Sequence, residues 1–152
     1  MPRRKKSSNY IQGIYRPTNP SKYAGVKSPR YLSSWELKFF RWCDNNDRVI
    51  KWGSETCKVP YISPVDGKMH KYLVDNVVHM ITKSGKVDKY LIEIKPKKQT
   101  KPPTKHGNKK KTTIIYEHTM YAINQAKWHA ARMFCKKHNY QFVILTEDEL
   151  FS

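Results

Sequence analysis

The strongest candidates for chemistry in this sequence lie on one short β-like segment, residues 90–95. Its residues alternate so that Glu93 and Lys95 share one face of the expected strand, while Ile92 and Ile94 occupy the other. An acid and a base would then stand side by side on a strand that is apolar enough to be central. A half-exposed strand whose polar face meets water is the alternative, and alternation alone does not separate the two.

Asp75 is a second candidate, because it interrupts a strongly β-forming run at residues 72–78, where aspartate is disfavoured. A hairpin centred near Gly85 would place Asp75 almost opposite Glu93 or Lys95. Residues opposite each other in such a hairpin have Cβ atoms about 4.5 to 5.5 Å apart, which one divalent cation can bridge. The competing explanation is a simple ion pair between Asp75 and Lys95.

Glu36 is the third acidic candidate and lies on an expected helix from Ser33 or Ser34 to about residue 45. A helical wheel places it within an aromatic arc, where a carboxylate is costly unless it is paired or bound to a metal. It could equally satisfy a buried Arg or Lys. The arc contains Trp35, Phe39, Phe40, Trp42 and Cys43, and leaves Lys38, Arg41 and Asp44 outside.

Three carboxylates and one lysine suit metal-assisted hydrolysis of a phosphodiester. Hard oxygen ligands from Glu36, Asp75 and Glu93 could hold Mg²⁺, with Mn²⁺ as the alternative ion. Lys95 could steady the developing charge or position the attacking water. The sequence lacks a Gly-x-x-x-x-Gly-Lys loop, so we expect no nucleotide cofactor.

The charge balance indicates a polyanionic partner. The 152 residues include 30 Lys and Arg against 12 Asp and Glu, a formal net charge of +18. Nucleic acid is the first candidate, because Lys and Arg contacts to phosphates release condensed counterions, and an acidic membrane surface is the second. No segment approaches the roughly 20 apolar residues of a membrane span. Three cysteines at unpaired spacings argue against a disulfide framework and a zinc site.

The remaining elements predict an extended basic arm followed by one domain with a mixed sheet. Three prolines within residues 1–30 oppose a persistent helix there. Residues 31–152 would form the single domain, in which a helix feeding a final buried strand indicates a crossover connection. We expect strands at residues 49–61 (interrupted at Gly53 and Ser54), 71–81, 89–94 and 140–145, a lysine-rich loop at 96–113, and a helix at 116–138.

The lysine-rich loop begins next to the candidate site, so it could hold a DNA backbone there. Lysine runs are otherwise often solvated and disordered. Lys127, on a helical face with Asn124, could also reach a phosphate, although a plain surface position is equally compatible with its spacing. The candidate DNA-binding residues are Lys97, Lys98, Lys101, Lys105, Lys109, Lys110, Lys111 and Lys127.

The order of a helix bearing Glu36, then Asp75, then Glu93-Ile94-Lys95 resembles the PD-(D/E)xK nuclease superfamily. Val74 stands where that superfamily usually has proline. A closer resemblance, to the head completion nucleases of large tailed bacteriophages, covers most of the chain. They are similar to the transposon-end-cleaving endonuclease subunit of the same fold. The shared segments are residues 10–13, 16–23, 31–36, 92–100, 124–128 and 142–147.

The resemblance implies an α/β (α+β) restriction-endonuclease-like fold, in which a mixed β-sheet is flanked by helices. It also implies an Mg²⁺-dependent endodeoxyribonuclease that uses Glu36, Asp75, Glu93 and Lys95 on double-stranded DNA. The protein would act in head completion, after DNA packaging and before tail attachment, in the host cell cytoplasm or associated with the virion, with head or neck proteins as further partners. The rival hypothesis is a non-catalytic basic DNA-binding or structural head or neck protein that keeps the nuclease fold.

Overall fold

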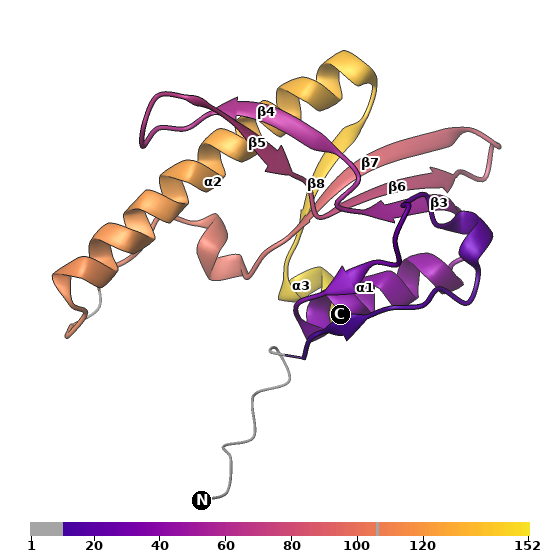
Figure 1. Cartoon of the computed structure of the whole chain (residues 1–152), viewed down its shortest axis with the longest axis horizontal. Coiled ribbons are helices and arrows are strands. Elements are labelled where there is room, and N and C mark those ends of the chain that lie inside the picture. Colours follow the sequence, from indigo (N-terminus) through magenta and orange to yellow (C-terminus); the bar gives the residue numbers. More distant parts are fainter. Residues whose placement is uncertain (1–10, 106) are drawn as a thin grey trace, which may run out of the picture.

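The computed structural model describes residues 11–105 and 107–152 (Figure 1). These described residues form three sheets, three α-helices and two short 3-10 helices. The elements, in chain order, are β1 (Gly13–Ile14), η2 (Pro20–Lys22), β2 (Arg30–Tyr31), α1 (Ser34–Asn45), β3 (Val49–Ser54), β4 (Lys58–Ile62), β5 (Met69–Leu73), β6 (Asn76–Ile81), β7 (Val87–Ile94), η3 (Lys97–Thr100), α2 (Lys111–His138), β8 (Gln141–Leu145) and α3 (Glu147–Leu150).

The main sheet is mixed, as the sequence predicts. Its order is β3-β6-β7-β8, with antiparallel β3-β6 and β6-β7 pairs and a parallel β7-β8 pair. Parallel neighbours need a crossover connection, and α2 supplies it. Figure 1 shows α1 and α3 on one side of this sheet, and α2 with the β4-β5 ribbon on the other. The predicted α+β architecture with flanking helices is therefore confirmed.

Two apolar cores form because the central strand β7 is buried on both faces. Leu91 points into a core with Trp128 of α2 and Tyr72 of β5, whereas its neighbour Ile92 packs on the other face with Phe40 and Trp52. Alternation along a strand sends successive side chains to opposite faces, so one strand serves both cores. This double burial fixes where the polar end of β7 emerges.

The prediction of one continuous strand at residues 71–81 is wrong, and the difference matters for the site. It breaks at Val74 and Asp75 into β5, which pairs with β4, and β6, which pairs with β3 and β7. At the break, a carboxylate oxygen of Asp75 accepts a hydrogen bond from the Ile94 backbone N–H at 2.8 Å. The last ladder pair, Asn76 with Ile92, places Asp75 one step further on, towards Glu93 and not Lys95.

Two other boundaries differ from expectation. The interruption after β3 falls at residues 55–57, where Glu55 adopts a positive φ of 56°, not at Gly53 and Ser54. Helix α2 begins at Lys111, so the lysine-rich loop expected at 96–113 is shorter and also contains η3. An ion pair of 2.9 Å between Lys109 and Glu117 fastens the end of the loop to the first turns of α2.

The part of the expected arm that the structure describes packs against α1 and β3. Its β1 pairs with β2, and the Ala24 N–H donates to the Trp52 carbonyl at 2.8 Å. This segment covers the side of α1 that carries Asp44, which is 0% exposed, although the helical wheel places it outside the core. Trp42, expected inside the arc, is 44% exposed, so the buried face of α1 includes Asp44 and not Trp42. Residues 1–10 of the predicted arm lie outside the described part.

Within the described residues, no helix combines the length and the apolar character needed to cross a membrane.

Candidate active site

The four predicted site residues meet in one cavity of about 320 Å³. They come from three places: Glu36 from the first turn of α1, Asp75 from the break between β5 and β6, and Glu93 and Lys95 from the end of β7. The cavity is lined by Ser33, Trp35, Glu36, Asp75, Glu93, Ile94, Lys95 and Pro96. Residues separated by up to about 60 positions in the chain therefore form a single acidic pocket with one lysine.

Glu36 is held at the start of α1 by helix capping. The Ser33 hydroxyl accepts from the Glu36 N–H at 3.2 Å, and one Glu36 carboxylate oxygen accepts from the Leu32 N–H at 2.6 Å. This arrangement satisfies N–H groups that the helix cannot use internally. Among the described residues Glu36 forms no ion pair with Lys or Arg. The alternative prediction, that Glu36 neutralises a buried Arg or Lys, is therefore wrong. Glu36 is half-buried and reaches the cavity.

Asp75 is fixed by the backbone of β7. Its Oδ2 accepts the Ile94 N–H described above, which leaves Oδ1 as the second oxygen of a carboxylate that lines the cavity. Burial raises the pKa of Asp75 to about 6; the Ile94 N–H opposes that rise and the negative charge of Glu36 adds to it. No ion pair joins Asp75 and Lys95 in the described structure, so the simple ion-pair explanation does not hold.

Glu93 is the most enclosed of the three acids, at 5% exposure. Its Oε2 accepts a hydrogen bond from the Tyr72 hydroxyl, and its Oε1 lies 3.9 Å from the Lys95 ammonium. Burial raises the pKa of Glu93, and the positive charges of Lys95 and Lys127 oppose that rise. The carboxylate is therefore held from two sides, with Oε1 turned towards Lys95.

Tyr72 is a site residue that sequence reasoning missed. It is 4% exposed on β5 and reaches Glu93 across 21 positions of sequence. In the sequence Tyr72 has the signature of an ordinary strand residue, and the contact exists only because the β4-β5 ribbon leaves the main sheet and folds over the end of β7. No local pattern could have indicated it.

Three carboxylates line the acidic pocket, where the predicted chemistry requires a metal ion. In the described part of the chain no three His, Cys, Asp or Glu side chains are grouped tightly enough to hold an ion by themselves. Mg²⁺, however, keeps several waters and takes only one or two carboxylates from a typical protein site. Asp75 and Glu93 are desolvated hard oxygen donors whose charged forms the nearby Glu36 disfavours, so the three carboxylates fit such an ion.

The eight predicted DNA-binding lysines fall into two groups. Three are engaged within the protein: Lys97 pairs with Asp148 at 2.8 Å, Lys109 pairs with Glu117, and the Lys127 ammonium lies 5.6 Å from the centre of the Tyr72 ring. The other five are exposed and form no ion pair within the described residues: Lys98, Lys101, Lys105, Lys110 and Lys111.

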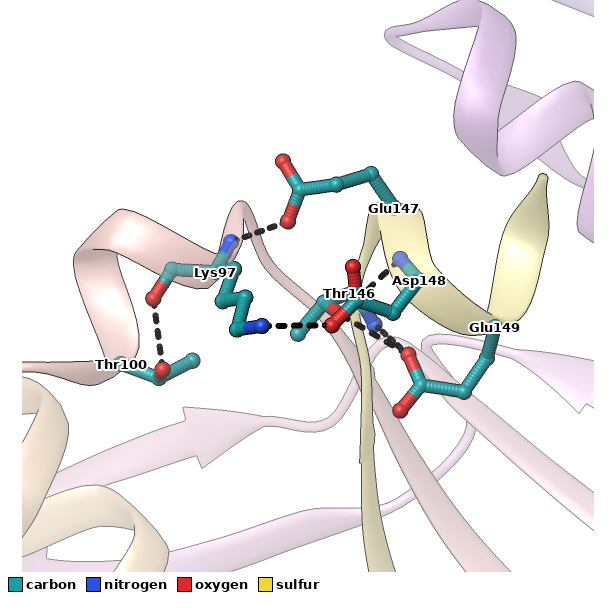
Figure 2. A network of polar contacts seen from close by, with 6 residues as sticks. All are labelled: Lys97, Thr100, Thr146, Glu147, Asp148 and Glu149. Atoms are coloured by element: carbon teal, nitrogen blue, oxygen red, sulfur yellow. Dashed lines mark hydrogen bonds and ion pairs between the residues drawn. The ribbon is translucent and has the colours of Figure 1, made fainter. Parts of the chain in front are cut away.

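The pairing of Lys97 belongs to a network that ties the exit of β7 to α3. Figure 2 shows the Lys97 side chain directed at Asp148, while the Lys97 N–H donates to Glu147 at 2.6 Å. Thr146 caps α3, and its N–H and hydroxyl both donate to Glu149 Oε2, at 2.7 and 2.8 Å. The Lys95 N–H also donates to the Leu145 carbonyl at 3.0 Å. Lys95 is therefore anchored by β8 and α3, and Lys97 serves this anchoring in the described structure.

The fold and the acidic pocket define a class of nuclease. A family model described as the TnsA-like endonuclease N-terminal domain matches residues 46–147, and the chain belongs to this family. The match includes Asp75, Glu93 and Lys95 but begins after Glu36, whose place in the site rests on the geometry alone.

The chain is also similar to a particular member of this class. It is 41% identical over 142 residues to the head completion nuclease of Enterobacteria phage T4, an alignment that covers 91% of this chain and 92% of that protein. A comparison with solved structures found no match.

Proposed function

We propose that this protein is an Mg²⁺-dependent endonuclease that hydrolyses phosphodiester bonds of double-stranded DNA in the pocket formed by Glu36, Asp75, Glu93 and Lys95. The convergence of these four residues in one cavity carries the proposal. The grouping of these acids is otherwise costly, because Asp75 and Glu93 are desolvated and the negative charge of Glu36 disfavours the charged form of both. A catalytic cation removes that cost, and the surplus of Lys and Arg suits the DNA.

Asp75 and Glu93 would hold the ion, with Glu36 as a further oxygen donor in direct or water-mediated contact. When bound, Mg²⁺ supplies Lewis-acid activation of the scissile phosphate and of a water molecule. The chain's own groups prepare the site: the Ile94 N–H orients Asp75, the Tyr72 hydroxyl orients Glu93, and the capping bonds orient Glu36.

Lys95 would stabilise charge on the phosphate during cleavage. Its ammonium lies beside Glu93 at the same cavity, and its backbone is held by β8. Preorganised positive charge of this kind acts where negative charge develops, and one such donor is worth roughly 100 to 1,000-fold in rate. This role needs no proton transfer by the lysine.

We further propose that the protein acts in phage head completion, on DNA that has been packaged and before the tail attaches. Support comes from the 41% identity to a protein named head completion nuclease, which spans nearly the whole of both chains. In this role the protein would act in the cytoplasm of the infected host cell or associated with the virion, in contact with head or neck proteins.

The test is nicking of supercoiled plasmid with Mg²⁺ or Mn²⁺. Asp75→Asn, Glu93→Gln and Lys95→Met should each reduce nicking at least about 100-fold, and EDTA should abolish it. Asp47→Asn is the matched control, because Asp47 is an exposed carboxylate outside the cavity. Wild-type nicking by the Asp75→Asn, Glu93→Gln double variant would refute the assignment. DNA binding without any metal-dependent nicking by the wild type would instead support the non-catalytic rival.

A further inference from the structure

A row of basic side chains crosses three neighbouring strands of the main sheet. Lys51 on β3 lies directly opposite His79 on β6, and His79 lies directly opposite Lys89 on β7. Residues paired in this way project from the same face with Cβ atoms about 4.5 to 5.5 Å apart. Two lysines therefore flank one imidazole on a single face of the sheet.

No acidic residue of the described chain neutralises the row. None of its three members takes part in an ion pair there. Asp88, the nearest acid along β7, is adjacent to Lys89 and so projects from the other face, where it interacts with Tyr90. Burial lowers the pKa of His79, and the positive charges of Lys89 and Lys51 lower it further. The positive potential of the row is left uncompensated.

The row borders a cavity of about 450 Å³ on the α2 side of the sheet. Lys51 and His79 line this cavity together with Lys58, Thr56 and Tyr140. The Tyr140 hydroxyl lies 3.3 Å from His79 Nε2, and the Lys89 ammonium lies 5.6 Å from the centre of the Tyr140 ring. The cavity also has apolar walls, to which Val77, Leu91 and Phe134 contribute. Its polar side chains include ammonium, imidazole and hydroxyl groups, which are donors that suit an oxyanion.

This cavity is separate from the acidic pocket. Leu91 lies between Lys89 and Glu93 on the same face of β7, and it is 0% exposed beneath the core formed with α2. From Asp75 to His79 the chain advances four residues, or about 13 Å along the strand direction. A ligand in one cavity therefore does not touch the other.

We propose that the row of Lys51, His79 and Lys89, with the cavity beside it, is a second phosphate-binding site that holds a backbone phosphate of DNA away from the acidic pocket. This inference rests on the proposed function for the identity of the ligand, while its geometry is independent of the acidic residues. A phosphate offers the negative charge that the row lacks, and its oxygens accept from all the donors around the cavity. DNA held there would be fixed at two points of the protein surface.

The test compares two double variants that remove the same charge. Lys51→Gln with Lys89→Gln removes two cations of the row; Lys83→Gln with Lys86→Gln removes two exposed lysines from the turn between β6 and β7. Binding of a short duplex is followed by fluorescence anisotropy in EDTA, from 50 to 200 mM salt. The row variant should flatten the plot of log affinity against log salt by about 0.9, since the proposed site holds one backbone phosphate and each phosphate contact contributes about 0.9. The turn variant should keep the wild-type slope.

Two further measurements identify the ligand and exclude misfolding. In the wild type, the imidazole NMR signals of His79 should shift on adding the duplex; a shift with inorganic phosphate alone would show that a free phosphate suffices, and a shift with the duplex only would show that the backbone is required. The melting temperature of the row variant should change little, because Lys51 and Lys89 are exposed and form no ion pair within the described residues.

The inference is overturned if neither ligand moves the His79 signals, or if the turn variant loses as much of the salt slope as the row variant. Because binding is measured in EDTA, an absence of nicking would count against the proposed function and not against this site.

Discussion

Asp44→Asn tests how the N-terminal segment is fastened to the helix that carries Glu36. The Asp44 carboxylate is fully buried and accepts from the Tyr15 hydroxyl at 2.5 Å, the Thr18 N–H and hydroxyl at 2.7 Å each, and the Asn19 N–H at 2.9 Å. Burial raises the pKa of Asp44, but these hydrogen bonds outweigh it and lower the pKa to about 2. The charged form is therefore the one that the fold stabilises.

The size of the effect follows from that pKa. A shift of the carboxyl pKa from about 3.9 in the unfolded chain to about 2 in the folded protein contributes roughly 2.5 kcal/mol to the free energy of unfolding. In the Asn variant the side-chain NH₂ would face the donors of Tyr15, Thr18 and Asn19, which it cannot accept from. At least one of these buried donors would lose its partner, which costs about 1 to 3 kcal/mol. We expect Asp44→Asn to lower the free energy of unfolding by about 3 to 5 kcal/mol at pH 7.

The pH dependence has a definite sign. A carboxyl group whose pKa is lowered by folding contributes its full stability above the unfolded value, near pH 4 to 5, and loses it as the pH falls towards 2. The difference between wild type and Asp44→Asn should therefore shrink as the pH is lowered from 5 towards 2. Urea unfolding followed by tryptophan fluorescence at several pH values measures it.

The matched control for this experiment is Asp47→Asn, three positions along the chain and exposed to solvent. It should change the free energy of unfolding by no more than about 0.5 kcal/mol. A loss of less than about 1 kcal/mol for Asp44→Asn, or a loss that stays constant from pH 7 to pH 3, would refute the reasoning.

Two further predictions concern the active site and the basic loop. Tyr72→Phe should reduce nicking by about 10 to 100-fold with little change in DNA affinity, because it removes a hydrogen bond to charged Glu93. Tyr61→Phe, which alters the other ring beneath Lys127, should nick like wild type, and equal losses in both variants would contradict a positioning role. Replacing Lys98, Lys101 and Lys105 by Gln should flatten the salt slope of DNA binding by about 2.7; an unchanged slope would mean that this loop does not contact DNA.

Local patterns in the sequence predicted the main elements and much of the candidate site. Alternation in residues 90–95 placed Glu93 and Lys95 on one face, and Ser33 capped the predicted helix that brings Glu36 to the cavity. The helix before the final apolar strand predicted the crossover that α2 makes. These features succeed because helix caps, periodicity and strand alternation are properties of short segments, which the residues of each segment specify themselves.

Tertiary structure alone decided the contacts that hold the site. The sequence did not indicate that Asp75 ends a strand, that Tyr72 reaches Glu93, or that the arm buries Asp44. It also could not separate the exposed loop lysines from Lys97, which is paired with α3. Each of these contacts joins segments far apart in the chain. Their existence depends on strand register and on which layer covers which face, and no periodicity within one segment records either.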